Sequence, residues 1–275
     1  MSLLSSILHT MLLSFIELLY LVGTFITVGL VIGVLERYSN AYFVKAFGPK
    51  GVLLTAWIGV PIHEIGHLIQ CFIWGHRVIR VKLLQFHHGD GVLGFVQHQY
   101  NPNSIYQQIG NFFIGLGPIF SGIGSLMFGM YLLIPESYES FIAYTHQHVT
   151  FEKLGIGVLK TTGRAVLELS KSLFTLHNLI NPLFWIFLLI AICISSHTSL
   201  SKKDIQGSAK GLLPIFGLLV FINIAGGILG FNSYQIIVRM AEYNAYVLAF
   251  SAIAVLFSLI TLVLSYILSS INIRN

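Results

Sequence analysis

A metal-binding motif lies inside an apolar run that is long enough to cross a membrane. The run covers residues 51–74, and the motif has the HExxH form, with His63, Glu64 and His67 as its fixed residues. Ionisable side chains near the middle of a spanning helix are energetically costly, so they usually carry a function. A spacing of four residues places both imidazoles on one helix face, where they could bind one metal ion. The motif therefore predicts a metal site, and the alternative is a buried polar cluster.

The composition independently indicates a membrane protein. Hydrophobic residues make up 55% of the chain, charged residues only 9%, and the mean hydropathy is +0.82. A water-soluble surface could not be covered with so few polar groups. Apolar stretches, each near the ~20 residues that a spanning helix needs, lie at about residues 11–34, 52–75, 107–134, 178–196, 211–230 and 244–270. We expect a single integral membrane domain over residues 1–275, all-α and polytopic, with about six transmembrane helices.

Charge and cysteine content exclude some functions. The net charge of +5 is modest and scattered, so it predicts contacts of juxtamembrane Lys and Arg with anionic lipid rather than nucleic-acid binding. The basic residues divide almost evenly between the two sides of the membrane, and the positive-inside rule leaves the orientation open. Cys71 and Cys193 both fall within apolar stretches, where small packing residues are expected.

The segment that follows the motif predicts a β-hairpin. Residues 78–83 and 92–96 are rich in β-prone side chains, and the sequence HGDG at 88–91 between them signals a tight turn. In the third apolar stretch, Pro118 is expected to kink the helix, and the glycines at 115 and 117 permit close helix contact.

Two further segments lie outside the expected spans. Residues 135–177 form an outer loop, and Lys160, Arg164 and Lys171 alternate with aliphatic residues in its second half. This pattern predicts an amphipathic helix on the membrane surface, with a gate or substrate contact as the alternative. Ser201 and Asp204 have the spacing of a helix N-cap and its third residue, which predicts a helix start.

Together these features resemble the site-2 protease family of intramembrane zinc metalloproteases. The strongest match is the continuous stretch 63–96, which is similar to the family's HExGH helix and the glycine-rich hairpin that folds back toward the site. The sequence GLGP at 115–118 resembles the family's small-Gly-Pro motif. Asp204, followed by Gly207, has the place of the family's acidic ligand in the order of motifs. The resemblance covers about residues 50–210.

The chain departs from the family pattern around the third ligand. The family usually carries an asparagine and prolines a few residues before an Asp-Gly pair. Here the Asn-Pro pair at 181–182 lies far upstream, and two residues separate Asp204 from Gly207. His197, directly after the fourth apolar stretch, is therefore the alternative third ligand, because imidazole binds zinc well.

The resemblance implies a zinc-dependent membrane metalloendopeptidase that cleaves membrane-anchored protein substrates within or near the bilayer. His63, His67 and Asp204 would hold the zinc, and Glu64 would act as the catalytic base. A small membrane-associated hairpin would bind extended substrate by strand addition. The hairpin and the loop before Asp204 would face the cytoplasm, with 135–177 outside, in a bacterial cytoplasmic membrane.

Other functions stay open. A different membrane metallohydrolase, such as a prenyl-processing protease, also places HExxH on a membrane helix, although the hairpin favours the site-2 type. A catalytically silent relative that binds membrane segments would have no need of Glu64. A metal transporter would carry ligands on several spans, whereas the other spans, apart from Glu17, are nearly bare of ionisable groups. We interpret Glu17 as a snorkelling or helix-contact residue.

Some polar residues near the motif have two interpretations. The histidines His87, His88 and His98 are typical of a polar turn or hairpin, although they could approach the metal. Asn111, on the third apolar stretch, either packs against a neighbouring helix or hydrogen-bonds a substrate backbone.

Overall fold

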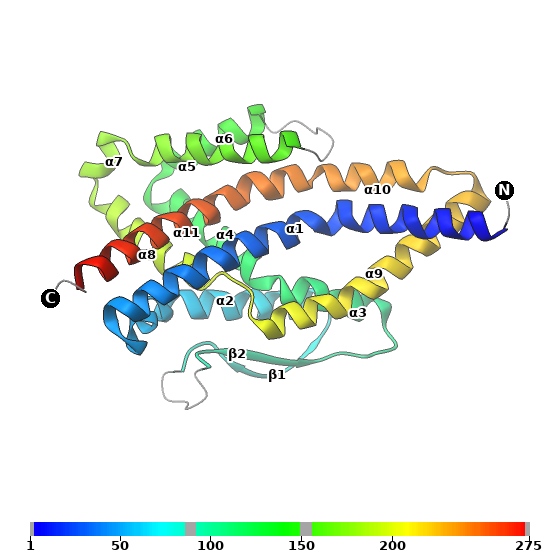
Figure 1. Ribbon diagram of the computed structural model, residues 1–275, viewed down its shortest axis with the longest axis horizontal. Helices are drawn as coiled ribbons and strands as arrows, with labels where there is room; N and C mark the ends of the chain where they lie inside the picture. The colour runs from blue at the N-terminus through cyan, green and yellow to red at the C-terminus, as the bar shows by residue number, and fades with distance from the viewer. Residues whose placement is uncertain (1–2, 86–91, 149–155, 273–275) are drawn as a thin grey trace.

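Helices long and apolar enough to cross a membrane dominate the fold of this chain (Figure 1). The computed structural model describes residues 3–85, 92–148 and 156–272. Within them, 4 candidate spans are present. They are α1 (Leu3–Phe47), a segment built on the short helix η1 (Pro49–Val52) and α2 (Leu53–Ile73), α9 (Lys202–Leu229), and α10 (Ser233–Glu242) followed by α11 (Asn244–Asn272).

The expected count of about six spans is not confirmed. In place of the span expected at 178–196, the structure has the short α7 (Leu176–Ile180) and then α8 (Pro182–Ser195), an apolar helix of 14 residues. At 1.5 Å per residue, α8 is about 21 Å long, shorter than the ~30 Å hydrocarbon core. α8 begins late because the side chain of Asn181 caps it, accepting a hydrogen bond from the N–H of Leu183 (3.0 Å).

The first helix is longer than the apolar stretch that predicted it. α1 has 45 residues and continues past the expected end at 34 to Phe47. No proline or glycine interrupts residues 34–47, so nothing local stops the helix. Gly48 ends it with a positive φ of 72°, a conformation that glycine adopts without a steric penalty.

The third apolar stretch is broken, as Pro118 predicted. Together, α3 (Ile105–Gly115) and α4 (Gly117–Leu133) are long and apolar enough to cross a membrane, but they bend by 55° where they meet. Pro118 lies in the first turn of α4, where its missing N–H is tolerated. A Cβ on Gly117 would lie 2.6 Å from the carbonyl carbon of Gly66, so α4 crosses the motif helix in direct backbone contact.

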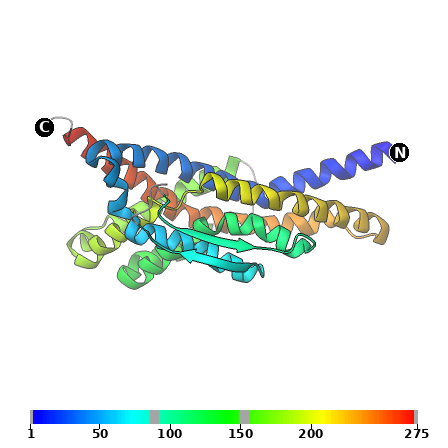
Figure 2. The ribbon, with the colours of Figure 1, turned by 90° about the horizontal axis from the view of Figure 1, so that it is seen from below.

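The predicted hairpin is present beside the motif helix (Figure 2). Strands β1 (Arg77–Lys82) and β2 (Phe95–Gln99) pair antiparallel, with Val81 opposite Val96. Gly75, with φ 66°, turns the chain from the end of α2 into β1. The expected turn at 88–91, together with His87 and His88, lies outside the described residues.

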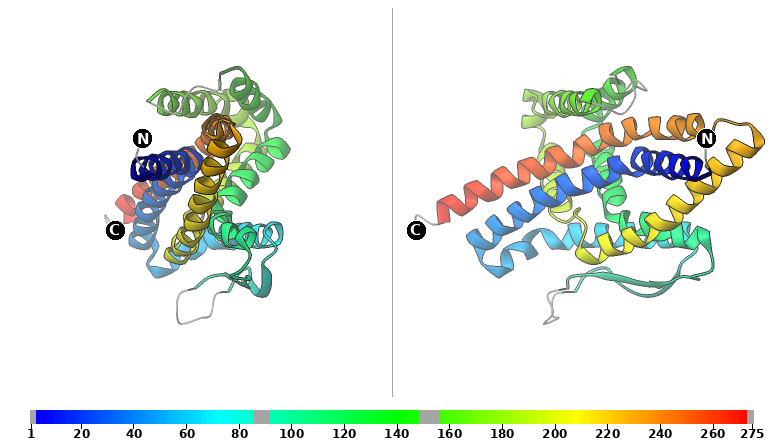
Figure 3. Two further views of the ribbon diagram at one scale, coloured as in Figure 1. Left: turned by 90° about the vertical axis from the view of Figure 1, so that its right-hand side faces the viewer. Right: turned by 45° about the vertical axis from the view of Figure 1, so that its right-hand side comes forward.

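The segment expected as an outer loop forms helices on the side opposite the hairpin (Figure 3). They are α5 (Pro135–His148) and α6 (Ile156–Leu173). Leu169 and Leu173 of α6 are fully buried, and the helix packs against α5 and α11. The amphipathic helix is thus confirmed as a helix with a buried face, whereas its place on a membrane surface stays a prediction.

Three buried residues agree with their sequence interpretation. Cys71 and Cys193 are both buried and unpaired, as expected of packing residues. Glu17 is fully buried and makes a polar helix contact, because its Oε2 accepts a hydrogen bond from Nδ2 of Asn223 on α9 (2.6 Å).

Candidate metal centre

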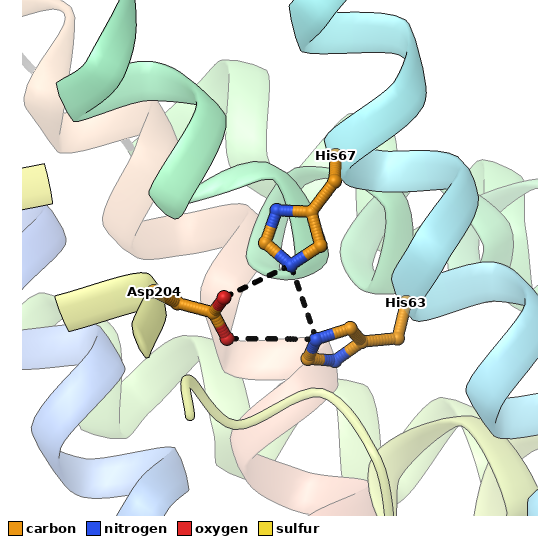
Figure 4. Close-up of side chains that lie close together, drawn as sticks. All are labelled: His63, His67 and Asp204. Carbon is orange, nitrogen blue, oxygen red and sulfur yellow. Dashed lines mark hydrogen bonds and ion pairs between the residues drawn. The ribbon is translucent and has the colours of Figure 1, made fainter. Parts of the chain in front are cut away.

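The two motif histidines and Asp204 converge on one point (Figure 4). Nε2 of His67 lies 3.2 Å from Oδ1 of Asp204, and Nε2 of His63 lies 3.6 Å from Oδ2. Among the described residues, these three form a group whose ligand atoms lie within 4.8 Å of one another. The helical spacing of the motif and the start of α9 therefore supply one nitrogen–nitrogen–oxygen donor set.

Backbone carbonyls orient both imidazoles. Nδ1 of His63 lies 2.8 Å from the carbonyl oxygen of His197, and Nδ1 of His67 lies 2.7 Å from that of Ile114. A carbonyl only accepts hydrogen bonds, so each Nδ1 carries the proton and each neutral ring presents a lone pair at Nε2. The two Nε2 atoms are 3.3 Å apart. The two Nε2 lone pairs and the carboxylate of Asp204 thus face one another. Histidines that bind metal ions are commonly oriented in this way, by a hydrogen bond from the ring nitrogen that does not face the metal.

Asp204 belongs to the donor set and also caps α9. Its Oδ2 accepts a hydrogen bond from the N–H of Ser201 (2.7 Å), and its own N–H donates to Oγ of Ser201 (3.2 Å). This reciprocal pair is a capping box, and it confirms the predicted helix start. Oδ1 remains directed at His67. The cap thus holds the carboxylate in the orientation that a ligand needs.

His197, the alternative third ligand, does not present its ring to this group. Its Nε2 is hydrogen-bonded to Oγ1 of Thr55 at 2.9 Å. Burial, followed by the charge of nearby His63, lowers the pKa of His197 to about 4, so the ring is neutral at pH 7. The backbone carbonyl of His197 is what serves the site, by orienting His63.

Glu64 lies in the cavity that contains the donor set. The cavity has a volume of about 670 Å³ and is lined by residues of α2, α3, α9 and the segment 92–100. Glu64 is buried, and a Cβ on Gly94 would lie 2.8 Å from its Cγ. The segment before β2 therefore packs closely over this carboxylate, and residue 94 must be glycine because a side chain there would collide with Glu64. Asn111 also lines the cavity, which keeps both interpretations of this residue open.

Sequence reasoning missed Glu36. This buried residue of α1 accepts a hydrogen bond at Oε2 from the N–H of Ser199 (2.7 Å). It thereby holds the short connection between His197, whose carbonyl orients His63, and the start of α9. An acidic residue just beyond a long apolar run was the available signal. The sequence held no signal for the carbonyl of Ile114, which orients His67, because every residue carries a backbone carbonyl.

Comparison of the chain with protein-family models, with curated proteins and with solved structures finds no match. The fold and the site define a mostly helical chain with membrane-type helices and a His₂Asp group that could hold a metal ion. Any narrower assignment depends on the chemistry of the site and on the motif resemblance.

Proposed function

We propose that this chain is an intramembrane zinc metalloprotease of the site-2 type, which cleaves membrane-anchored protein substrates within or near the bilayer. The observation that carries the proposal is the convergence of His63, His67 and Asp204 in the cavity that also contains Glu64. The HExxH spacing, the glycine-covered base and the hairpin directly after the motif support the protease class.

The donor set suits zinc. Zinc in catalytic sites commonly takes three protein ligands from histidine and carboxylate and leaves a fourth position open. Without a cation, the lone pairs of His63 and His67 would face a carboxylate at close range, which is electrostatically unfavourable. Bound zinc would supply a Lewis acid that lowers the pKa of water to about 7 and polarises the scissile carbonyl.

Glu64 would act as general base and then as general acid. It directly follows a metal-ligand candidate, and it lines the cavity rather than pairing with a described basic residue. Its carboxylate would accept a proton from the attacking water and deliver that proton to the leaving nitrogen. The carbonyls behind His63 and His67 keep both rings oriented during these steps.

The cavity favours an extended substrate segment. Its lining follows the chain from Val92 to Tyr100, beside the motif helix. A peptide bond in a helix hides its carbonyl, so the segment must unwind before cleavage. Strand addition to the hairpin would hold the unwound segment. Proline at several hairpin edge positions is expected to abolish cleavage without loss of zinc, and unchanged cleavage would exclude this binding mode.

Two alternatives have less support. A catalytically silent relative would not need a carboxylate at residue 64, held in the cavity under Gly94. A metal transporter would use ligand groups along its path, whereas the described residues contain a single group of three such ligands. A different membrane metallohydrolase shares the donor set, and only substrate tests separate it. The bacterial cytoplasmic membrane as location, with the hairpin inside, stays a prediction.

The deciding experiment combines metal analysis with a cleavage assay on a panel of single-span membrane proteins. Glu64→Gln is expected to keep zinc and lose at least ~10²-fold in cleavage rate, because an amide cannot accept the proton. Glu139→Gln, an exposed change on α5, is the matched control and should retain the native rate. Cleavage close to native in Glu64→Gln would remove the protease assignment.

A further inference from the structure

A second pair of histidines, outside the donor set, lies beside the metal cavity, and one of the two lines it. His76 follows the end of α2, and His98 belongs to β2. Their Nδ1 atoms are 2.9 Å apart, a hydrogen-bond distance. Nε2 of His76 also lies 2.8 Å from the carbonyl oxygen of Gln107. The three groups form a chain of hydrogen bonds that begins at a backbone carbonyl.

The positions of the protons in this chain follow from its first member. The carbonyl of Gln107 can only accept, so Nε2 of His76 carries a proton. His76 is buried, and burial lowers its pKa, so the ring is neutral and its Nδ1 keeps a lone pair. Nδ1 of His98 must therefore donate to Nδ1 of His76. With its proton used there, a neutral His98 keeps a lone pair at Nε2.

The neutral form of His98 is favoured by its surroundings. Burial lowers the pKa of His98 to about 4, and the nearby rings of His76 and His67 act in the same direction. No described residue forms a hydrogen bond with Nε2 of His98. This chain of hydrogen bonds therefore leaves Nε2 of His98 as an acceptor that has no hydrogen-bond partner among the described residues.

His98 lines the same cavity as the motif. Along β2 and its flanks, the lining residues are Gly94, Phe95, Val96, His98 and Tyr100, whereas Gln97, next to His98, does not contribute. Gly94 lies against Glu64. His98 is four positions after Gly94, a span of about 13 Å in extended chain at ~3.3 Å per residue. An extended substrate beside the strand would reach His98 roughly three or four residues from the bond at the metal centre.

We propose that His98 forms a specificity subsite that accepts a hydrogen bond from a neutral hydroxyl or carboxamide side chain of the substrate. The position relative to the scissile bond rests on the proposed protease function. A carboxylate offers no proton to the Nε2 lone pair. A cationic side chain, like a carboxylate, is excluded by chemistry, because a protonated amine or guanidinium would enter a cavity where three lysines, Lys202, Lys203 and Lys210, outnumber the carboxylates of Glu64 and Asp204. A neutral donor is the class that fits.

The proton assignment is tested on the full chain, independently of any activity. Histidine labelled with ¹⁵N, in the protein held in lipid nanodiscs, reports the tautomer of each ring. His98 is expected to be neutral with its proton on Nδ1 at pH 7, and its signal is identified by its loss in His98→Phe. His76→Phe removes the acceptor, so the proton should redistribute to Nε2. A native His98 with its proton on Nε2, or one doubly protonated at pH 7, would overturn the proposal.

The subsite itself is tested by binding to the Glu64→Gln protein, which should not cleave its ligand. The probes are synthetic single-span peptides of leucine and alanine, with one serine moved through successive positions. At one position, serine is expected to tighten binding about 3- to 10-fold over alanine, the usual scale of one hydrogen bond. The preference should vanish when His98→Phe is added and persist when Gln97→Ala, a change on the other strand face, is added.

The outcomes separate this inference from the proposed function. Binding that is absent or equal at every serine position, or a preference that survives His98→Phe, overturns the subsite. A serine preference in a protein whose native form cleaves no peptide supports the subsite and counts against the protease. Cleavage by the native chain without a serine preference supports the protease and excludes the subsite.

Discussion

Asp204 and His67 approach to 3.2 Å between Oδ1 and Nε2, while the other oxygen of Asp204 accepts the N–H of Ser201. The start of α9 is therefore built on the same carboxylate that faces the motif histidines. A helix N-terminus carries a partial positive charge, which favours this carboxylate in its ionised form. Secondary structure and site chemistry are thus linked through one side chain, and a substitution can separate them.

Asp204→Asn is expected to remove most of the metal affinity while it preserves the helix start. The amide oxygen can still accept from Ser201, but it lacks the negative charge that a ligand contributes. Metal content after purification and helix content by circular dichroism measure the two effects. Ser201→Ala is the matched control, because it should cost about 0.5–2 kcal/mol of stability and leave the metal bound. Full metal content in Asp204→Asn would show that Asp204 caps α9 without binding the metal.

His197→Ala should leave metal content nearly native. The ring of His197 contacts Thr55, and its backbone carbonyl, which orients His63, survives the substitution. The lost hydrogen bond and packing should lower stability by roughly 1 kcal/mol or more, seen as a lower Tm. If His197→Ala strips the metal and Asp204→Asn does not, the third ligand is His197.

Glu36→Ala is expected to weaken metal binding although Glu36 is no ligand. Its carboxylate holds the N–H of Ser199, and without it the connection that carries the His197 carbonyl is less ordered. Loss of an outer-sphere partner typically costs about 10- to 100-fold in metal affinity, measured by competition with a chelator. Glu36→Gln retains an oxygen acceptor and should recover most of the affinity. Equal affinity in Glu36→Ala and native protein would contradict the positioning role.

Gly94→Ala should reduce cleavage and spare the metal. The added methyl would lie 2.8 Å from Cγ of Glu64 and from Cγ1 of Val60, so the hairpin must shift away from the base. Gly124→Ala on α4 is the control, because a Cβ there meets nothing within 4 Å. That control should keep activity and gain up to ~1 kcal/mol in helix stability. Native cleavage in Gly94→Ala would show that the hairpin does not need close approach to Glu64.

Local sequence signals predicted much of the site's framework. The spacing of His63 and His67 defines one helix face in any α-helix, and the pair Ser201 and Asp204 forms a cap through neighbouring backbone. Pro118 marked the helix break for the same local reason. The hairpin after the motif also followed from its own residues. Each of these features depends on groups within a few residues of one another.

The tertiary structure alone decided how these pieces meet. The carbonyl that orients His63 belongs to a residue 134 positions away, and a backbone carbonyl leaves no trace in the sequence pattern. That Asp204, and not the ring of His197, faces the motif histidines depends on where α9 starts relative to α2. Hydrophobic periodicity determines which residues are buried, but contacts between distant helices determine which polar groups converge.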